Sequence, residues 1–390
     1  MFSTVRLVIG LLALAAGPAW AGSFRTVHTF ASGDDGAHPT GGMTLGKGQI
    51  YGTTTEGGPD NLGTIFQLDP ATGDLTILYA FEGGDDGANP DAAPIYHKGI
   101  LYGTDRAGGE GFGAVYAFNL KTGEITSLHV FTDGEDGGNP VGSLRLKSNA
   151  LYGTAAIGAA KGCINDDGCG TVFQIDLASG DFATLYAFPN DETQGGNPVG
   201  GLLLQSGALL GTAFTGGINN EGQPADGTLF ALDPATGEIT NLHVFDGLDG
   251  SGPLGNMLYR KGTLYGAASL AGTGCTGGCG TLFSYDFKGG GFAVLHQFTG
   301  TDGRDPKGGL IFRKGLIYGT TLGGGTGCSN NCGTVFSLNP ATGALTTLYN
   351  FTGGADGEQP WGGLVYYKHT FYGTNELGAD GYGTIFALKP

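Results

Sequence analysis

Apolar and polar residues alternate along most of the chain, in short runs separated by Gly, Asn, Asp and Pro. Alternation with a period of two is typical of β-strands that bury one face. In the middle of the chain this pattern predicts four successive strands, at residues 200–205, 208–213, 227–233 and 238–245. Runs of Ala, Leu, Glu and Lys, which favour helices, are nearly absent, so the pattern predicts an all-β chain.

The strand pattern repeats, with a period in the low fifties. A strand that ends in Tyr-Gly-Thr, a strand that starts with Gly-Thr-apolar-Phe and a strand that ends in Phe each recur seven times, some in degenerate copies. Seven units of four strands at this spacing predict the blades of a β-propeller.

The two ends of the chain complete this prediction. A lone fourth strand comes first, at residues 24–30, and a lone third strand comes last, at residues 383–388. Pairing these two strands closes the ring and removes both exposed sheet edges. We therefore predict one seven-bladed β-propeller domain over residues 22–390, with four-stranded blades and the N-terminal strand paired to the C-terminal blade.

Leu-Tyr-Gly-Thr, Gly-Thr-apolar-Phe and Asp-Gly-x-x-Pro-x-Gly-Gly are the elements of the repeat. With them the chain resembles the GloVer (Gloeo/Verruco) tandem-repeat family of exported bacterial proteins, from the predicted cleavage site to the C-terminus. That family is defined by its repeat and not by an activity. The resemblance therefore implies a secreted or surface β-propeller-like protein and no particular reaction.

The first residues have the pattern of a signal peptide. Arg6 gives a positive start, residues 7–16 are apolar, and Ala19-Trp20-Ala21 is a small-x-small cleavage sequence. We predict a signal peptide at residues 1–21 and a secreted or periplasmic protein. No later segment has the length of apolar sequence that spans a membrane.

The composition of the chain limits the kinds of partner that it can bind. Glycine accounts for 80 of the 390 residues without the three-residue period of collagen, and the formal net charge is −17. Such acidity excludes nucleic acid and anionic membranes as natural partners. Most acidic residues fall in the long loops and blade connections, which share one face of a propeller. The basic residues that join them there are Arg106, Lys161, Arg304 and Lys307.

The six cysteines form three local pairs, each just before a Gly-Thr strand start. In an exported chain they predict three short-range disulfides, because the alternative, a metal site, lacks a set of four ligands. The predicted disulfides are Cys163–Cys169, Cys275–Cys279 and Cys328–Cys332.

The blade connections carry an Asp-Gly pair. We treat its aspartates as candidate ligand-binding residues: Asp35, Asp86, Asp136, Asp249, Asp302 and Asp356. Oxygen-rich Asp/Gly loops suit Ca²⁺, although Asp before Gly is also ordinary turn chemistry and the spacing is not that of an EF-hand. The Ca²⁺ candidates are Asp34, Asp35, Asp85, Asp86, Asp133 and Asp136. Histidines in four fourth strands occupy the place of tyrosines in the others, which favours packing: His28, His129, His243 and His296.

Trp361 is the only tryptophan after the predicted cleavage site and starts an inner strand, where it is a candidate for stacking on a sugar or for blade packing. The same position in the other repeats holds Thr40, Asp91, Val141, Val199, Leu254 and Lys307. Motifs of nucleophilic, zinc-protease and nucleotide chemistry do not occur, and no catalytic residue or certain cofactor is assigned.

We therefore expect a binding module, monomeric and non-enzymatic, that uses its acidic long-loop face for a glycan, a cationic or other extracellular protein, or Ca²⁺. Two alternatives stay open. One is an extracellular enzyme acting on polysaccharide, a glycoside hydrolase or lyase that uses loop carboxylates. The other is a structural component of the cell envelope.

Overall fold

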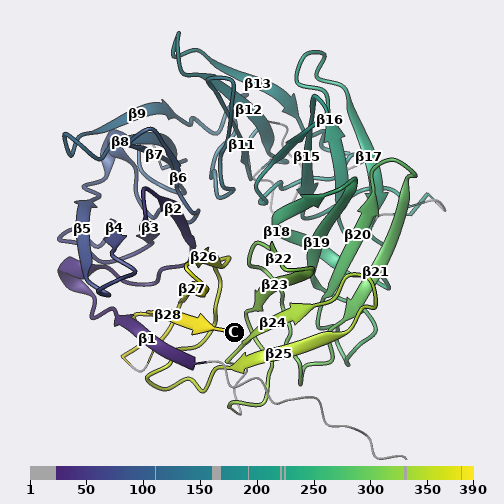
Figure 1. The fold of residues 1–390 in the computed structure, drawn as a ribbon. Helices are drawn as coiled ribbons and strands as arrows, with labels where there is room; N and C mark the ends of the chain where they lie inside the picture. Colours follow the sequence, from purple (N-terminus) through teal and green to yellow (C-terminus); the bar gives the residue numbers. More distant parts are fainter. Residues whose placement is uncertain are drawn as a thin grey trace, which may run out of the picture.

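The computed structural model describes residues 23–390 apart from residues 110, 160–167, 192, 220–221, 224, 329–331 and 379. In this part of the chain, seven four-stranded sheets stand around a ring (Figure 1). The predicted all-β, seven-bladed propeller is confirmed, whereas the predicted signal peptide lies outside the described residues. No helix within the described residues is long and apolar enough to cross a membrane.

We number the blades in chain order. Blade 1 consists of β2 (Met43–Gly46), β3 (Gln49–Thr54), β4 (Thr64–Leu68) and β5 (Leu75–Ala80). Blade 2 consists of β6 (Ile95–His97), β7 (Ile100–Asp105), β8 (Ala114–Asn119) and β9 (Ile125–Val130). Blade 3 consists of β10 (Arg145–Lys147), β11 (Ala150–Ala155), β12 (Thr171–Asp176) and β13 (Phe182–Ala187). Blade 4 consists of β14 (Leu203–Gln205), β15 (Ala208–Ala213), β16 (Thr228–Leu232) and β17 (Ile239–Val244). Blade 5 consists of β18 (Ser251–Arg260), β19 (Thr263–Leu270), β20 (Thr281–Asp286) and β21 (Gly291–Gln297). Blade 6 consists of β22 (Ile311–Arg313), β23 (Leu316–Thr321), β24 (Thr334–Leu338) and β25 (Leu345–Asn350). Blade 7 consists of β26 (Val365–Tyr367), β27 (Thr370–Asn375), β28 (Thr384–Lys389) and β1 (Ser23–Thr29).

Blade 7 closes the ring with both ends of the chain. Strand β1 pairs antiparallel with β28, with Phe24 opposite Leu388 and Thr29 opposite Thr384. Figure 1 shows the purple N-terminal strand beside the yellow C-terminal one. The predicted closure is therefore confirmed, and each terminal strand is paired with the other.

The hydrophobic core lies between neighbouring blades. One cluster joins Met43 and Phe66 of blade 1 to Phe30, Tyr372 and Ile385 of blade 7. The glycine of Tyr-Gly-Thr makes room for this packing, because a Cβ atom on Gly52 would overlap the ring of Phe66. The glycine thus lets a large aromatic ring cross the second strand of each blade.

The inner strand of blade 4 is shorter than the sequence pattern predicts. In blade 4 we predict a first strand from residue 200, but β14 begins at Leu203. Residues 200 and 201 instead pack against a neighbouring blade, since a Cβ atom on Gly200 would lie 3.2 Å from the Gly255 carbonyl oxygen. A Cβ atom on Gly41 would likewise lie 2.7 Å from the Ala92 carbonyl carbon. Small residues are therefore required where the blades approach the axis.

Candidate functional site

The residue that follows the proline of each blade connection lies at the central opening of the ring. All seven of these residues line one cavity of about 390 Å³, which we call the mouth pocket: Thr40, Asp91, Val141, Val199, Leu254, Lys307 and Trp361. First strands start and second strands end on the same side of each blade, because neighbouring strands are antiparallel. The mouth pocket therefore belongs to the face that carries the long loops.

The ring of seven residues is divided into two arcs. Blades 3, 4 and 5 contribute an apolar arc of Val141, Val199 and Leu254, and Phe214 after β15 lines the same side. Blades 6, 7, 1 and 2 contribute a polar arc, which Arg106 after β7 extends: Lys307, Trp361, Thr40 and Asp91. The mouth pocket therefore offers an apolar wall facing a wall of charged, aromatic and hydroxyl groups.

Specific contacts hold the polar arc in place. The Lys307 Nζ atom lies 4.1 Å from the centre of the Trp361 ring, a cation–π contact. The Thr40 hydroxyl donates a hydrogen bond of 2.6 Å to Asp91 Oδ1. Arg106 Nη1 lies 3.9 Å from Asp91 Oδ2, which is too long for a hydrogen bond. The polar arc therefore contains two groups of contacts, one between blades 6 and 7 and one between blades 1 and 2.

The ionisable groups around the polar arc have lost part of their water. Burial raises the pKa of Asp91, although the Thr40 hydrogen bond and Arg106 act to lower it. Burial also raises the pKa of Glu376 and lowers that of Lys307. Carboxyl and amino groups with shifted pKa values are typical of binding and catalytic sites.

Asn256 occupies the floor of the mouth pocket. The equivalent position in the other six blades holds a small residue: Gly42, Ala93, Ser143, Gly201, Gly309 or Gly363. Asn256 also lines a second cavity of about 290 Å³, and its Nδ2 atom donates a hydrogen bond of 3.3 Å to Ser143 Oγ of blade 3. Its side chain therefore lies at the boundary of the two cavities. The sequence analysis missed this residue, although comparing the repeats at this position would have found it.

The family comparison identifies the repeat. The model of the Gloeobacter/Verrucomicrobia repeat matches residues 18–225 and 219–390. The chain belongs to this repeat family. The predicted resemblance is therefore confirmed, and no protein of curated function matches the sequence.

Solved structures share the fold of this repeat protein. An oligogalacturonate lyase in complex with manganese has a TM-score of 0.55 at 12% identity, covering 94% of this chain and 96% of that chain. The oligogalacturonate lyase of Vibrio parahaemolyticus has a TM-score of 0.52 at 10% identity, with the same coverage of 94% and 96%. TolB of Acinetobacter baumannii has a TM-score of 0.47 at 13% identity, covering 77% of this chain and 63% of that chain. For the two lyases, identities this low show a common fold alone.

The aspartates of the Asp-Gly pairs bind side chains of the fourth strands. Each accepts a hydrogen bond from the histidine or tyrosine six or seven residues earlier: His28–Asp35 at 3.2 Å, Tyr79–Asp86 at 2.9 Å, His129–Asp136 at 3.0 Å, His243–Asp249 at 2.6 Å, His296–Asp302 at 2.9 Å and Tyr349–Asp356 at 3.0 Å. A ring N–H or a phenol O–H can make this bond, which explains why histidine and tyrosine interchange in the repeat. None of the six aspartates is among the residues that line the mouth pocket. Their binding of a ligand stays a prediction.

The Ca²⁺ hypothesis also stays a prediction. Asp34 and Asp85 are exposed. Among the described residues, the one group of three His, Cys, Asp or Glu side chains with ligand atoms within 4.8 Å of one another is Cys328, Cys332 and Glu358. The two cysteines of this group are joined in a disulfide, so neither offers the thiolate that binds metals.

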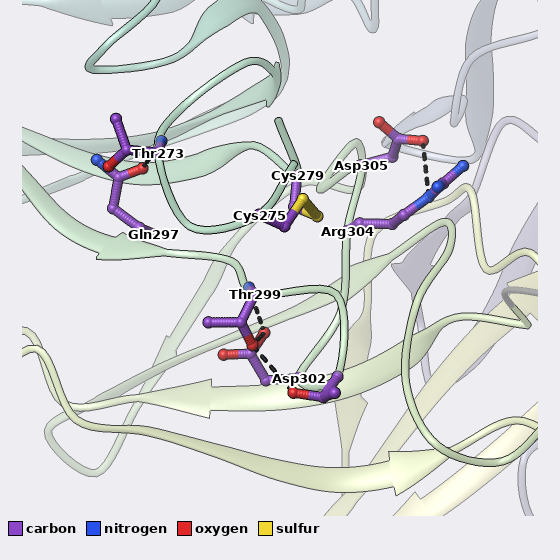
Figure 2. Close-up of a disulfide and its surroundings, with 9 residues drawn as sticks. Thr273, Cys275, Cys279, Gln297, Thr299, Asp302, Arg304 and Asp305 are labelled. Atoms are coloured by element: carbon purple, nitrogen blue, oxygen red, sulfur yellow. Dashed lines mark hydrogen bonds and ion pairs between the residues drawn. A yellow bond between two sulfur atoms is a disulfide. The ribbon is translucent and has the colours of Figure 1, made fainter. Parts of the chain in front are cut away.

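Two of the three predicted disulfides are confirmed in this repeat protein. Cys275–Cys279 and Cys328–Cys332 are bonded, with Cα atoms 5.8 Å and 6.1 Å apart. The predicted Cys163–Cys169 pair involves residues outside the described part of the chain. Figure 2 shows the first bond beside the connection to blade 6, where Thr299 donates to Asp302 through its backbone N–H at 2.8 Å. These disulfides close loops on the face of the mouth pocket.

Proposed function

We propose that this chain is a non-catalytic binding propeller that holds a carbohydrate unit in the mouth pocket. The observation that carries the proposal is the ring of seven equivalent repeat positions, which line one pocket and yet differ in chemistry. Its volume of about 390 Å³ falls within the range of small-molecule sites. Repeats that served packing alone would have no need of this divergence.

A carbohydrate matches the division of the pocket into two arcs. Sugar rings present apolar C–H faces and polar hydroxyl edges, so one face can pack on Val141, Val199 and Leu254. Hydroxyl groups can then exchange hydrogen bonds with Thr40 and Asp91 of the polar arc. Trp361 supplies the aromatic surface that sugar sites commonly contain.

The proposed location is the cell exterior or periplasm, where polysaccharides are met. Two disulfides in the described part of the chain support an oxidising compartment. The signal-peptide pattern of residues 1–21 belongs to the same proposal.

An enzyme acting on polysaccharide is the second candidate. The observation that favours it is the pair Asp91 and Glu376, two carboxyl groups near the pocket whose pKa values are raised by burial. A carboxyl group with a raised pKa can donate a proton to a leaving oxygen.

A glycan array followed by mass spectrometry of the bound glycans separates these candidates. We expect retention without cleavage, and Trp361→Ala should weaken the retained glycan about tenfold or more. Tyr366→Ala is the matched control, because Tyr366 also packs against a cation, Arg313, at 4.4 Å but lies outside the mouth pocket. Shortened glycans would replace the binding proposal by the enzyme, and failure to retain any glycan would contradict both.

A further inference from the structure

The basic residues of the acidic face are concentrated at the mouth pocket. Sequence analysis places four basic residues on the long-loop face, among them Lys161, which lies outside the described residues. Of the other three, Arg106 and Lys307 line the mouth pocket, and Arg304 does not. In a chain with 18 basic and 35 acidic residues, this placement sets the pocket apart from the face around it.

Both cations keep hydrogen-bond donors for a ligand. Among the described residues, no carboxylate oxygen lies within 4.0 Å of Lys307 Nζ, whose contact is with the Trp361 ring. The Arg106 side chain is 49% exposed, and its nearest carboxylate oxygen, on Asp91, is 3.9 Å away. A guanidinium group has five N–H donors, so Arg106 can bind a further anion in the pocket.

Three carboxylates in the surroundings of the polar arc have other partners. Asp91 accepts the Thr40 hydroxyl, and Asp305 Oδ2 lies 3.8 Å from Arg304 Nε. Glu56 lies 3.7 Å from His38. Burial lowers the pKa of Lys307, while Asp305 and Glu376 act in the opposite direction. The Lys307 ammonium is therefore partly desolvated, and no carboxylate oxygen of the described residues lies within 4.0 Å of it. An anionic ligand would stabilise this arrangement.

We infer that the mouth pocket selects an acidic carbohydrate, a uronic acid unit whose carboxylate binds at Lys307 or Arg106 while its ring packs on the apolar arc. This inference rests on the proposed function and names the class of sugar. Asp91 adds a constraint, since its charge disfavours a carboxylate beside it and its free oxygen suits a sugar hydroxyl. The acid group is therefore directed to the cationic side of the polar arc.

The test uses two probes that differ in charge, trigalacturonic acid and its fully methyl-esterified form, in isothermal titration calorimetry with the disulfide-bonded protein. We expect the acid to bind at least about tenfold more tightly than the ester, because a hydrogen bond to a charged group outweighs one to a neutral group by about this factor. The preference should weaken as the salt concentration rises.

Substitutions assign the preference to residues. Of Lys307→Gln and Arg106→Gln, the variant that removes the cation at the carboxylate should lower the affinity for the acid about tenfold and leave the ester nearly unchanged. Arg304→Gln removes the same charge from the same face outside the pocket and should retain the preference. Equal binding of acid and ester, or an unchanged preference in both pocket variants, would overturn the inference but not the carbohydrate proposal. Binding of neither probe, together with an empty glycan array, would overturn both.

Discussion

Replacing Asp105 by asparagine is expected to stabilise the fold, increasingly so as the pH rises. Asp105 ends β7 and is 0% exposed. Neither of its carboxyl oxygens has a hydrogen-bond partner among the described residues. Blade 7 has Asn375 at this position, where its Nδ2 atom donates hydrogen bonds of 2.9 Å to the Asp356 carbonyl oxygen and to Thr384 Oγ1. Asparagine therefore fits this position of the blade, although blade 2 has Ala114 where blade 7 has Thr384, so the hydrogen bond to a hydroxyl is lacking there.

The magnitude follows from the buried carboxyl group. Burial raises the pKa of Asp105 well above its ordinary value, and the charge of Asp86 adds to this. A raised pKa means that the folded state keeps a proton that the unfolded chain releases above pH about 3.9. Below that pH, Asp105 does not reduce the free energy of unfolding. As the pH rises from there toward the folded pKa, the free energy of unfolding falls by about 1.4 kcal/mol per pH unit. At pH 7 the loss is limited to about 4 kcal/mol.

Asparagine has no proton to lose, so Asp105→Asn should gain about 1–4 kcal/mol of unfolding free energy at pH 7 and almost nothing near pH 4. Urea unfolding at several pH values measures this, with Trp361 as the fluorescent reporter in protein expressed from residue 22. Asp85→Asn is the control, because Asp85 is exposed and lies in the same blade connection as Asp86. A gain that is independent of pH, or a variant less stable than the parent at pH 7, would refute the reasoning.

Two further substitutions test the blade packing by the same unfolding assay. Tyr116→Phe should stabilise the protein by about 1 kcal/mol, because the hydroxyl group is buried without a partner among the described residues; an equal loss would show that the hydroxyl is satisfied. Asp302→Ala should cost about 2 kcal/mol or more, since it removes the acceptor of His296 and Thr299. Burial acts to raise the pKa of Asp302, but these hydrogen bonds lower it overall, so the cost should shrink as the pH falls through the folded pKa. A cost that persists unchanged in acid would contradict this account.

Most of the fold could be predicted from the sequence, because each strand pattern recurs in seven copies and errors in one copy are corrected by the others. The ends of the chain added the closure, since a lone fourth strand and a lone third strand complement each other. The start of the inner strands could not be predicted in this way. Alternation does not distinguish residues 200 and 201, which pack against neighbouring blades, from those of β14, which pair with β15.

The candidate site could be predicted only in part. The repeat showed that Trp361 stands where other blades have different residues, but it did not show that all seven positions line one pocket. The bond between the fourth-strand histidines and the Asp-Gly aspartates was also missed, although His296 and Asp302 are only six residues apart. In the sequence, turn chemistry is sufficient to explain the aspartate, and packing is sufficient to explain the histidine. Only the structure shows that the histidine and the aspartate lie within hydrogen-bond distance of each other.

Departures from the repeat have two different physical meanings in this molecule, and blade 2 contains both. Asp105 is buried in the blade and is expected to destabilise it, whereas its neighbour Arg106 lines the mouth pocket. Residues that lower the stability of the fold are common beside binding residues, because the site limits which residues its neighbours can be. If Asp105→Asn gains stability and keeps the preference for the acidic probe, the cost is incidental to binding. If the stabilised variant loses that preference while Asp85→Asn keeps it, the buried carboxyl group positions Arg106, and the two departures belong to one site.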